Sequence, residues 1–161
     1  MISPQNYQQW LDFFTYLYAN PMNYKALDLV EEGTFNGDVS EEFLEELSKA
    51  VAMLLTVHCK RFLKKVDEAY IDNDFEFIAV LVVRLRQNII RSLFYRKLNF
   101  LSREHIKSLD AGFHKQIDSF WINFMNELSK DFVQKASSEF ESLMLFVKRI
   151  NLLRKEDTVN G

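Results

Sequence analysis

The stretch from Phe75 to Leu98, FEFIAVLVVRLRQNIIRSLFYRKL, constrains the fold of this chain more than any other segment. Its first half is apolar in almost every direction, and its second half adds arginines without losing an apolar stripe. At 3.6 residues per turn, one helix face carries Phe75, Ile78, Val82, Leu85, Ile89 and Leu93. Because a helix that is apolar all round is normally covered by several neighbours, the sequence predicts a central helix whose N-terminal half is enclosed.

The composition favours an all-helical globular domain in a reducing compartment. Only four Gly and two Pro occur in 161 residues, too few for the many turns of an all-β fold. Cys59 is the single cysteine, so no internal disulfide framework is possible and a cytoplasmic location is expected. The N-terminus MISPQNYQQW has no basic region and no long apolar run, so no signal peptide is expected. No apolar run reaches the roughly 18 residues of a membrane span, and no membrane association is expected.

Helical periodicity recurs along most of the chain. Ser3-Pro4 predicts the start of a first helix, and Asn20-Pro21 ends it and opens a short second one. After a loop at 31–38, the patterns predict long helices over about 41–70, 75–98, 103–128 and 132–153. The predicted N-caps of the first three long helices are Asp38, Asn73 and Ser102, and a break near Ser129 separates the last two.

These helices predict an all-α fold: an antiparallel bundle of four long helices preceded by a short N-terminal helical pair. Short connections between successive helices favour antiparallel neighbours, whereas a globin-like helical stack is the alternative architecture. The expected organisation is one helical domain over 1–156, with the helical pair at 1–32 and the bundle at 39–156. Residues 157–161 are expected to form a frayed tail.

No pattern in the sequence indicates catalysis, a cofactor or a metal site. A di-iron bundle requires Glu-x-x-His, which no histidine here supplies, and Asp110 with His114 gives only two ligands on one face. His58 and Cys59 are adjacent on a helix, so their side chains diverge by about 100° and the imidazole is poorly placed to activate the thiol. Both are expected to be core residues. We therefore expect a protein that is not an enzyme.

Charge is distributed unevenly along the chain. Residues 1–50 hold two Lys against nine acidic residues, whereas residues 51–115 hold twelve Lys and Arg against seven acidic residues. The candidate anion-binding or partner-binding surface consists of Arg84, Arg91, Arg96, Lys97, Arg103 and Lys107. Such a set would bind phosphates in a salt-dependent, largely sequence-independent manner. The simpler interpretation is that these cations are solvated or pair with the acidic N-terminal region.

Several aromatic residues fall off or beside the main apolar stripes. The candidate interface aromatics are Phe13, Tyr16, Tyr24, Tyr95 and Phe100. Because aromatic residues left over after core filling often serve interfaces, the leading hypothesis is a helical protein-interaction or regulatory domain that self-associates or binds a protein partner. A nucleic-acid-associated regulator is the second hypothesis, and a sensor that binds a small apolar ligand inside the bundle is the third. Alternatively, the N-terminal pair packs on the bundle and uses all of these rings.

Overall fold

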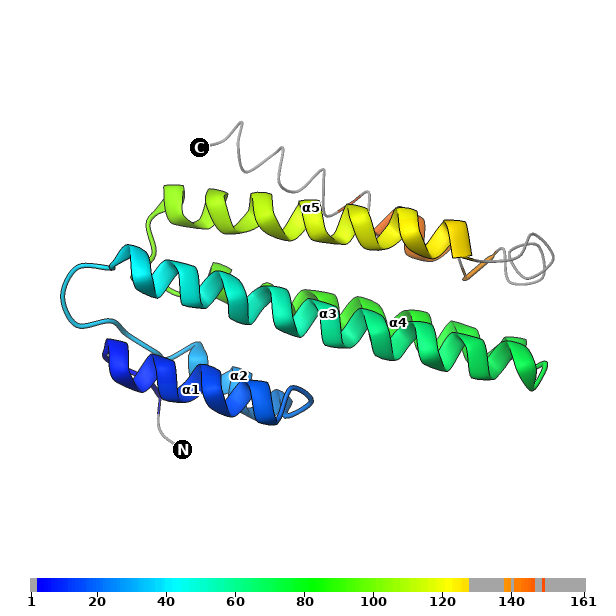
Figure 1. The fold of residues 1–161 in the computed structure, drawn as a ribbon, viewed down its shortest axis with the longest axis horizontal. Helices are drawn as coiled ribbons and strands as arrows, with labels where there is room; N and C mark the ends of the chain where they lie inside the picture. The colour runs from blue at the N-terminus through cyan, green and yellow to red at the C-terminus, as the bar shows by residue number, and fades with distance from the viewer. Residues whose placement is uncertain (1–2, 128–137, 140, 147–148, 150–161) are drawn as a thin grey trace. The chain divides into compact units, whose positions relative to one another are not determined.

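The computed structural model describes residues 3–127, 138–139, 141–146 and 149, which are helical apart from short connections (Figure 1). The elements are α1 (Tyr7–Ala19), α2 (Tyr24–Val30), α3 (Glu41–Ile71), α4 (Phe75–Ser92), the 3-10 helix η1 (Phe94–Lys97) and α5 (Arg103–Glu127). No strand occurs among the described residues, and the prediction of an all-α bundle is confirmed. The predicted break near Ser129 and the predicted tail at 157–161 lie outside the described residues.

The chain divides into two compact units, each assembled from separate stretches of sequence. Unit 1 comprises residues 1–57 and 90–113, and unit 2 comprises residues 58–89 and 114–161. Each of α3, α4 and α5 therefore contributes a segment to both units. The organisation as one domain over 1–156 stays a prediction.

An aromatic cluster centred on Trp10 forms the core of unit 1. The Trp10 ring has no exposed surface, and its centroid lies 5.5–6.0 Å from those of four phenylalanines: Phe13, Phe14, Phe43 and Phe100. Its indole Nε1 donates a hydrogen bond of 2.7 Å to the carbonyl oxygen of Thr34, which satisfies the polar atom that burial would otherwise leave without a partner. The loop at 31–40 is thereby tied to α1.

Close packing against this indole requires glycine at position 33. A Cβ atom added to Gly33 would lie 2.7 Å from Trp10 Cζ2 and 3.0 Å from Cη2. Both distances are shorter than van der Waals contact, and the buried indole has little room to move. The segment at 31–38, EEGTFNGD, was predicted to be a loop, and the structure confirms this. The close contact with the Trp10 indole explains why position 33 is a glycine.

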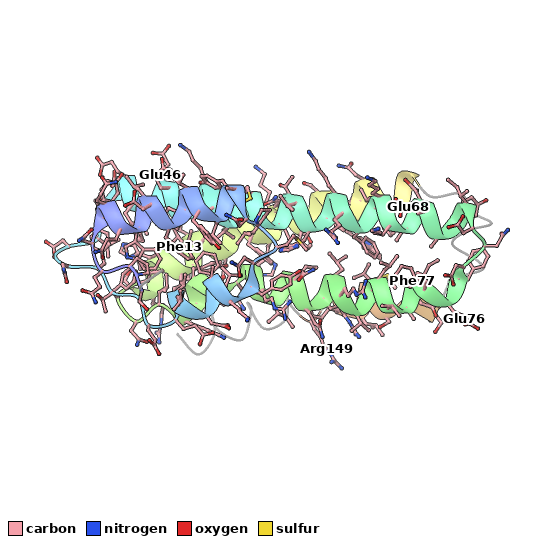
Figure 2. The ribbon with its side chains drawn as sticks, turned by 90° about the horizontal axis from the view of Figure 1, so that it is seen from below. Phe13, Glu46, Glu68, Glu76, Phe77 and Arg149 are labelled. Atoms are coloured by element: carbon pink, nitrogen blue, oxygen red, sulfur yellow. The ribbon has the colours of Figure 1, made fainter. Side chains whose placement is uncertain are left out.

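Unit 2 contains an antiparallel helix pair. The C-terminal part of α3 and the N-terminal part of α4 run side by side in opposite directions and are joined by a short turn at 72–74 (Figures 1 and 2). Asn73 adopts a positive φ of 53°, which asparagine tolerates better than most residues. The buried side of α4 presents Ile78, Leu81, Val82 and Leu85. Across the same unit, the ring centroids of Phe62 and Phe124 lie 5.4 Å apart.

The helix starts differ from three of the predicted caps. The first helix begins at Tyr7, where the Asn6 side chain accepts a hydrogen bond from Gln9 N, and not at Ser3-Pro4. Ser40 replaces Asp38 as the cap of α3, and Asp74 replaces Asn73 as the cap of α4. In each case the capping side chain stands immediately before the first helical residue, as the geometry of an N-cap requires. Ser102 caps α5 as predicted.

The helix α4 ends earlier than the apolar pattern predicted. It stops at Ser92, and the chain continues as η1 through Lys97, where Arg96 N donates to the carbonyl oxygen of Leu93. No Gly or Pro marks this change, so tertiary packing decides it: Phe94, Tyr95 and Leu98 are all buried in unit 1. The change of helix type places Tyr95 where its hydroxyl reaches α5.

Candidate functional site

Arg96 belongs to a buried polar cluster in unit 1. Its Nε donates a hydrogen bond of 2.9 Å to Asp110 Oδ1, and the Tyr95 hydroxyl donates to the same oxygen. Burial alone would lower the pKa of the Arg96 guanidinium, but the hydrogen bond and the negative charge of Asp110 raise it overall. Desolvation and the Asp110 carboxylate together raise the pKa of Tyr95. The arginine is therefore the counter-ion of a buried carboxylate and is held in place by it.

Two further candidate cations of unit 1 contact residues of the same unit. Lys97 Nζ lies 2.6 Å from Glu31 Oε1, although both side chains are largely exposed. The guanidinium carbon of Arg91 lies 4.0 Å from the centroid of the Tyr24 ring, a cation–π contact. The pair between Lys97 and Glu31 confirms in one instance the prediction that the acidic N-terminal region supplies partners for these cations.

The three remaining candidate cations are Arg84, Arg103 and Lys107. Arg103 and Lys107 are exposed in the first two turns of α5, within unit 1. Arg84 lies in unit 2, where its guanidinium carbon stands 5.8 Å from the centroid of the Phe77 ring. The structure therefore brings five of the six cations into unit 1, and three of these five contact Asp110, Glu31 or Tyr24.

Two of the candidate interface aromatics are core residues of unit 1. Phe13 is buried and packs edge-to-face on Trp10, and Figure 2 shows it on the inner side of α1. Tyr95 has no exposed surface. Phe100 is half-buried and joins the Trp10 cluster, 5.9 Å from Phe35. Phe13 and Tyr95 thus correct the expectation from sequence, because buried rings offer a partner almost no contact area.

Tyr16 and Tyr24 are half-buried and accept contacts within unit 1. The Asn23 side-chain amide donates a hydrogen bond to the Tyr16 hydroxyl, and Arg91 covers the Tyr24 ring. These contacts support the alternative that the N-terminal helices pack on the bundle and use the surplus rings themselves. An interface role for the two tyrosines stays a prediction.

The residues with the most reactive side chains are buried. His58 and Cys59 both lie in the interior of unit 2, as the sequence predicted for core residues. Desolvation raises the pKa of the Cys59 thiol to about 12, so the thiolate that a nucleophile requires is scarce at neutral pH. Among the described residues, no group of three or more His, Cys, Asp or Glu side chains is arranged to hold a metal ion.

The exposed side of α4 in unit 2 departs most from the sequence-based expectation. Its residues, hereafter the α4 face, are Glu76, Ala79, Val80, Val83, Arg84 and Gln87. Val80 is 42% exposed and Val83 is 44% exposed. The prediction that the N-terminal half of this helix is enclosed on all sides is therefore wrong, because only the opposite side is buried by the rest of the unit.

Charges flank the two valines of the α4 face. Glu76 lies four residues before Val80, in the first turn of α4, and Figure 2 shows it pointing away from α3. Arg84 lies four residues after Val80 and leans toward Phe77. Within the described chain neither Glu76 nor Arg84 has an ion-pair partner. The α4 face therefore has an aliphatic centre with an acid at one end and a base at the other.

A cavity of about 320 Å³ in unit 2 is lined by both charged and apolar side chains. Its walls include Arg86, Glu141 and Arg149, with Leu145 and Phe146 as apolar surface. Arg86 is oriented by a hydrogen bond of 3.3 Å from its Nη1 to Ser142 Oγ and by the Phe146 ring, 5.9 Å away. Binding of a small apolar ligand in the bundle stays a prediction.

The described part of the chain contains no helix that combines the length and the apolar character needed to cross a membrane. Searches against protein-family models, characterised proteins and solved structures found no match to this chain.

Proposed function

We propose that this chain is a non-catalytic protein-interaction or regulatory domain that binds a protein through the α4 face. The observation that carries the proposal is the exposure of Val80 and Val83 on a helix whose first half is apolar in almost every direction. A helix that exposes only polar residues needs no cover, whereas exposed valines on one face gain free energy when a partner removes them from water.

The side chains of the α4 face suit an interface. Val80 and Val83 are β-branched, so they lose little rotamer freedom when a partner covers them. Glu76 and Arg84 provide charges at the rim, where they favour one partner orientation over others. This surface is aliphatic and differs from the aromatic face that the sequence suggested.

Support for the nucleic-acid alternative is weaker, because three of its six proposed cations already contact other groups of the chain. Arg96 neutralises Asp110, Lys97 pairs with Glu31, and Arg91 covers Tyr24. A phosphate backbone would have to compete with each of these contacts. The α4 face also carries Glu76, which repels a polyanion.

The burial of the most reactive side chains supports a non-catalytic role. The Cys59 thiol is buried with its pKa raised, and His58 is buried beside it in the sequence. Neither is accessible to a substrate. A single buried cysteine also fits the proposed cytoplasmic location, since no disulfide is needed for stability.

The proposal is tested by affinity capture from the native cells with the tagged chain and two variants. V80D/V83D places charges on the α4 face, and I122D places one on α5 in unit 2, where Ile122 is 59% exposed. We expect V80D/V83D to lose the proteins that the wild type captures, and I122D to retain them. Equal capture by all three proteins would refute a role for the α4 face.

A further inference from the structure

We infer that the α4 face binds the α4 face of a second copy of this chain, with the two helices antiparallel and crossing at Val80. This inference rests on the proposed function and names its partner. Its basis is the order of side chains along the face: Glu76, Val80 and Arg84 follow one another at intervals of four residues. Residues at this interval lie on the same side of a helix, one turn apart.

This order is self-complementary in the antiparallel orientation. When Val80 faces Val80 of the second copy, Glu76 faces Arg84 of the second copy, and the two-fold axis repeats the contact at the other end. Two symmetric ion pairs therefore enclose the apolar centre. A parallel pairing instead places Glu76 against Glu76 and Arg84 against Arg84, and both contacts are repulsive.

The apolar residues on either side of Val80 also fit this antiparallel alignment. Val83 stands three residues after Val80, and Phe77 stands three residues before it. In the antiparallel pair each Val83 therefore faces the exposed part of Phe77 of the second copy. Phe77 is half-buried, and Arg84 covers part of its ring, so the ring and the guanidinium form one continuous surface.

The available charges also favour this partner over an unrelated one. Within the described chain Glu76 and Arg84 lack ion-pair partners, and each is the complement that the other needs. One helix face buries less area than a standard interface, so we expect a weak dimer whose population depends on concentration.

Charge exchange tests the orientation in sedimentation equilibrium. We expect the wild type to dimerise, and E76R or R84E to raise the Kd about tenfold, since each converts two attractions into two repulsions. The double variant E76R/R84E restores both ion pairs and should return toward the wild-type Kd. An equimolar mixture of E76R with R84E should also associate, because the heterodimer contains two correctly matched pairs.

Controls separate this effect from a change in net charge or in folding. D67R alters an exposed residue of α3 in unit 2 and changes the net charge as E76R does, so it should leave the Kd unchanged. Circular dichroism should match the wild type for every variant, because all substituted residues are exposed. Melting should fall only slightly for the variants that carry E76R, which places a cation in the first turn of α4.

This inference would be overturned if the wild type stays monomeric. It would also be overturned if the wild type dimerises with a Kd that the charge exchanges at Glu76 and Arg84 do not change. If the chain is monomeric but V80D/V83D still abolishes capture of a different protein, the proposed function stands and only self-association fails. If capture is also unaffected, both fail.

Discussion

Arg96 Nε and Asp110 Oδ1 lie 2.9 Å apart, and this contact joins η1 to α5 inside unit 1. The Asp110 side chain is 7% exposed and the Arg96 side chain 23% exposed, so water screens the pair only partly. The Tyr95 hydroxyl donates to the same carboxylate oxygen. Removing the carboxylate charge therefore weakens two contacts at once and leaves the guanidinium with a neutral neighbour.

We predict that D110N lowers the free energy of unfolding by about 1–3 kcal/mol. The substitution retains the size of the side chain, so the loss reflects charge and hydrogen bonding and not a cavity. Urea titration followed by circular dichroism measures it. The control K107Q alters an exposed residue of the same helix and should change stability by less than about 0.5 kcal/mol. Equal effects of the two substitutions would contradict the role assigned to Asp110.

Two glycines should respond to alanine with opposite signs. G33A should lower the free energy of unfolding by about 1–3 kcal/mol, because the new Cβ collides with the Trp10 indole. G112A should raise it by about 0.5–1 kcal/mol, because Gly112 lies inside α5 with no described atom within 4 Å of the added Cβ. Thermal melting of both variants measures the difference. A G33A protein as stable as the wild type would show that the loop does not pack on Trp10 as described.

Cys59 should make stability depend on alkaline pH. The pKa of this thiol rises from 9.0 to about 12 on folding, because burial disfavours the thiolate. The unfolded chain releases the proton first, so the contribution of Cys59 is complete below pH 9 and is lost as the pH rises toward 12. Above pH 9 the wild type should lose up to about 1.4 kcal/mol per pH unit more than C59A.

Urea titrations of both proteins between about pH 8 and 10 measure how the free energy of unfolding changes with pH. The Tyr and Lys side chains that begin to titrate in this range are the same in both proteins, so the difference between the two slopes reports Cys59. C59A itself creates a small cavity and lowers stability at every pH, so the slopes are compared and not the absolute values. Parallel slopes would contradict the burial of the thiol.

The Arg91–Tyr24 contact should give a measurable coupling energy. The guanidinium lies 4.0 Å from the ring centroid, and such contacts contribute about 0.5–1 kcal/mol at exposed sites. A double-mutant cycle with R91Q, Y24L and the combined variant isolates this energy from the other effects of each substitution. A coupling of zero would contradict a stabilising role for this cation–π contact.

The helices could be predicted from the sequence where their cause is local. The apolar periodicity of α3 indicated a helix over 41–70, and the structure has it at Glu41–Ile71. The Asn20-Pro21 break between the first two helices was also predicted correctly. The N-caps were harder to predict, because Ser, Asp and Asn side chains near a helix start can all accept the capping hydrogen bond. Only the position of the first helical residue decides which of them does so. At α3, Ser40 was selected over Asp38.

Features with a non-local cause could not be predicted. Asp110 was considered only as a metal ligand, since nothing in the sequence shows that η1 brings Arg96 beside it. Tyr95 was assigned to an interface because it falls off or beside the main apolar stripes, yet the 3-10 turn directs its hydroxyl to Asp110. The valines of the α4 face were expected to be enclosed, because periodicity shows which sides of a helix are apolar but not how many neighbours the chain can provide.

Thiol labelling at V80C tests the central claim most directly. Single variants V80C and I122C are labelled with a maleimide in dilute buffer and in native-cell extract, and the buried Cys59 should react slowly in both. We predict that the extract slows labelling of V80C relative to I122C, because a protein covers the α4 face. Equal rate changes at the two positions would contradict the proposal that the α4 face is a protein-binding surface.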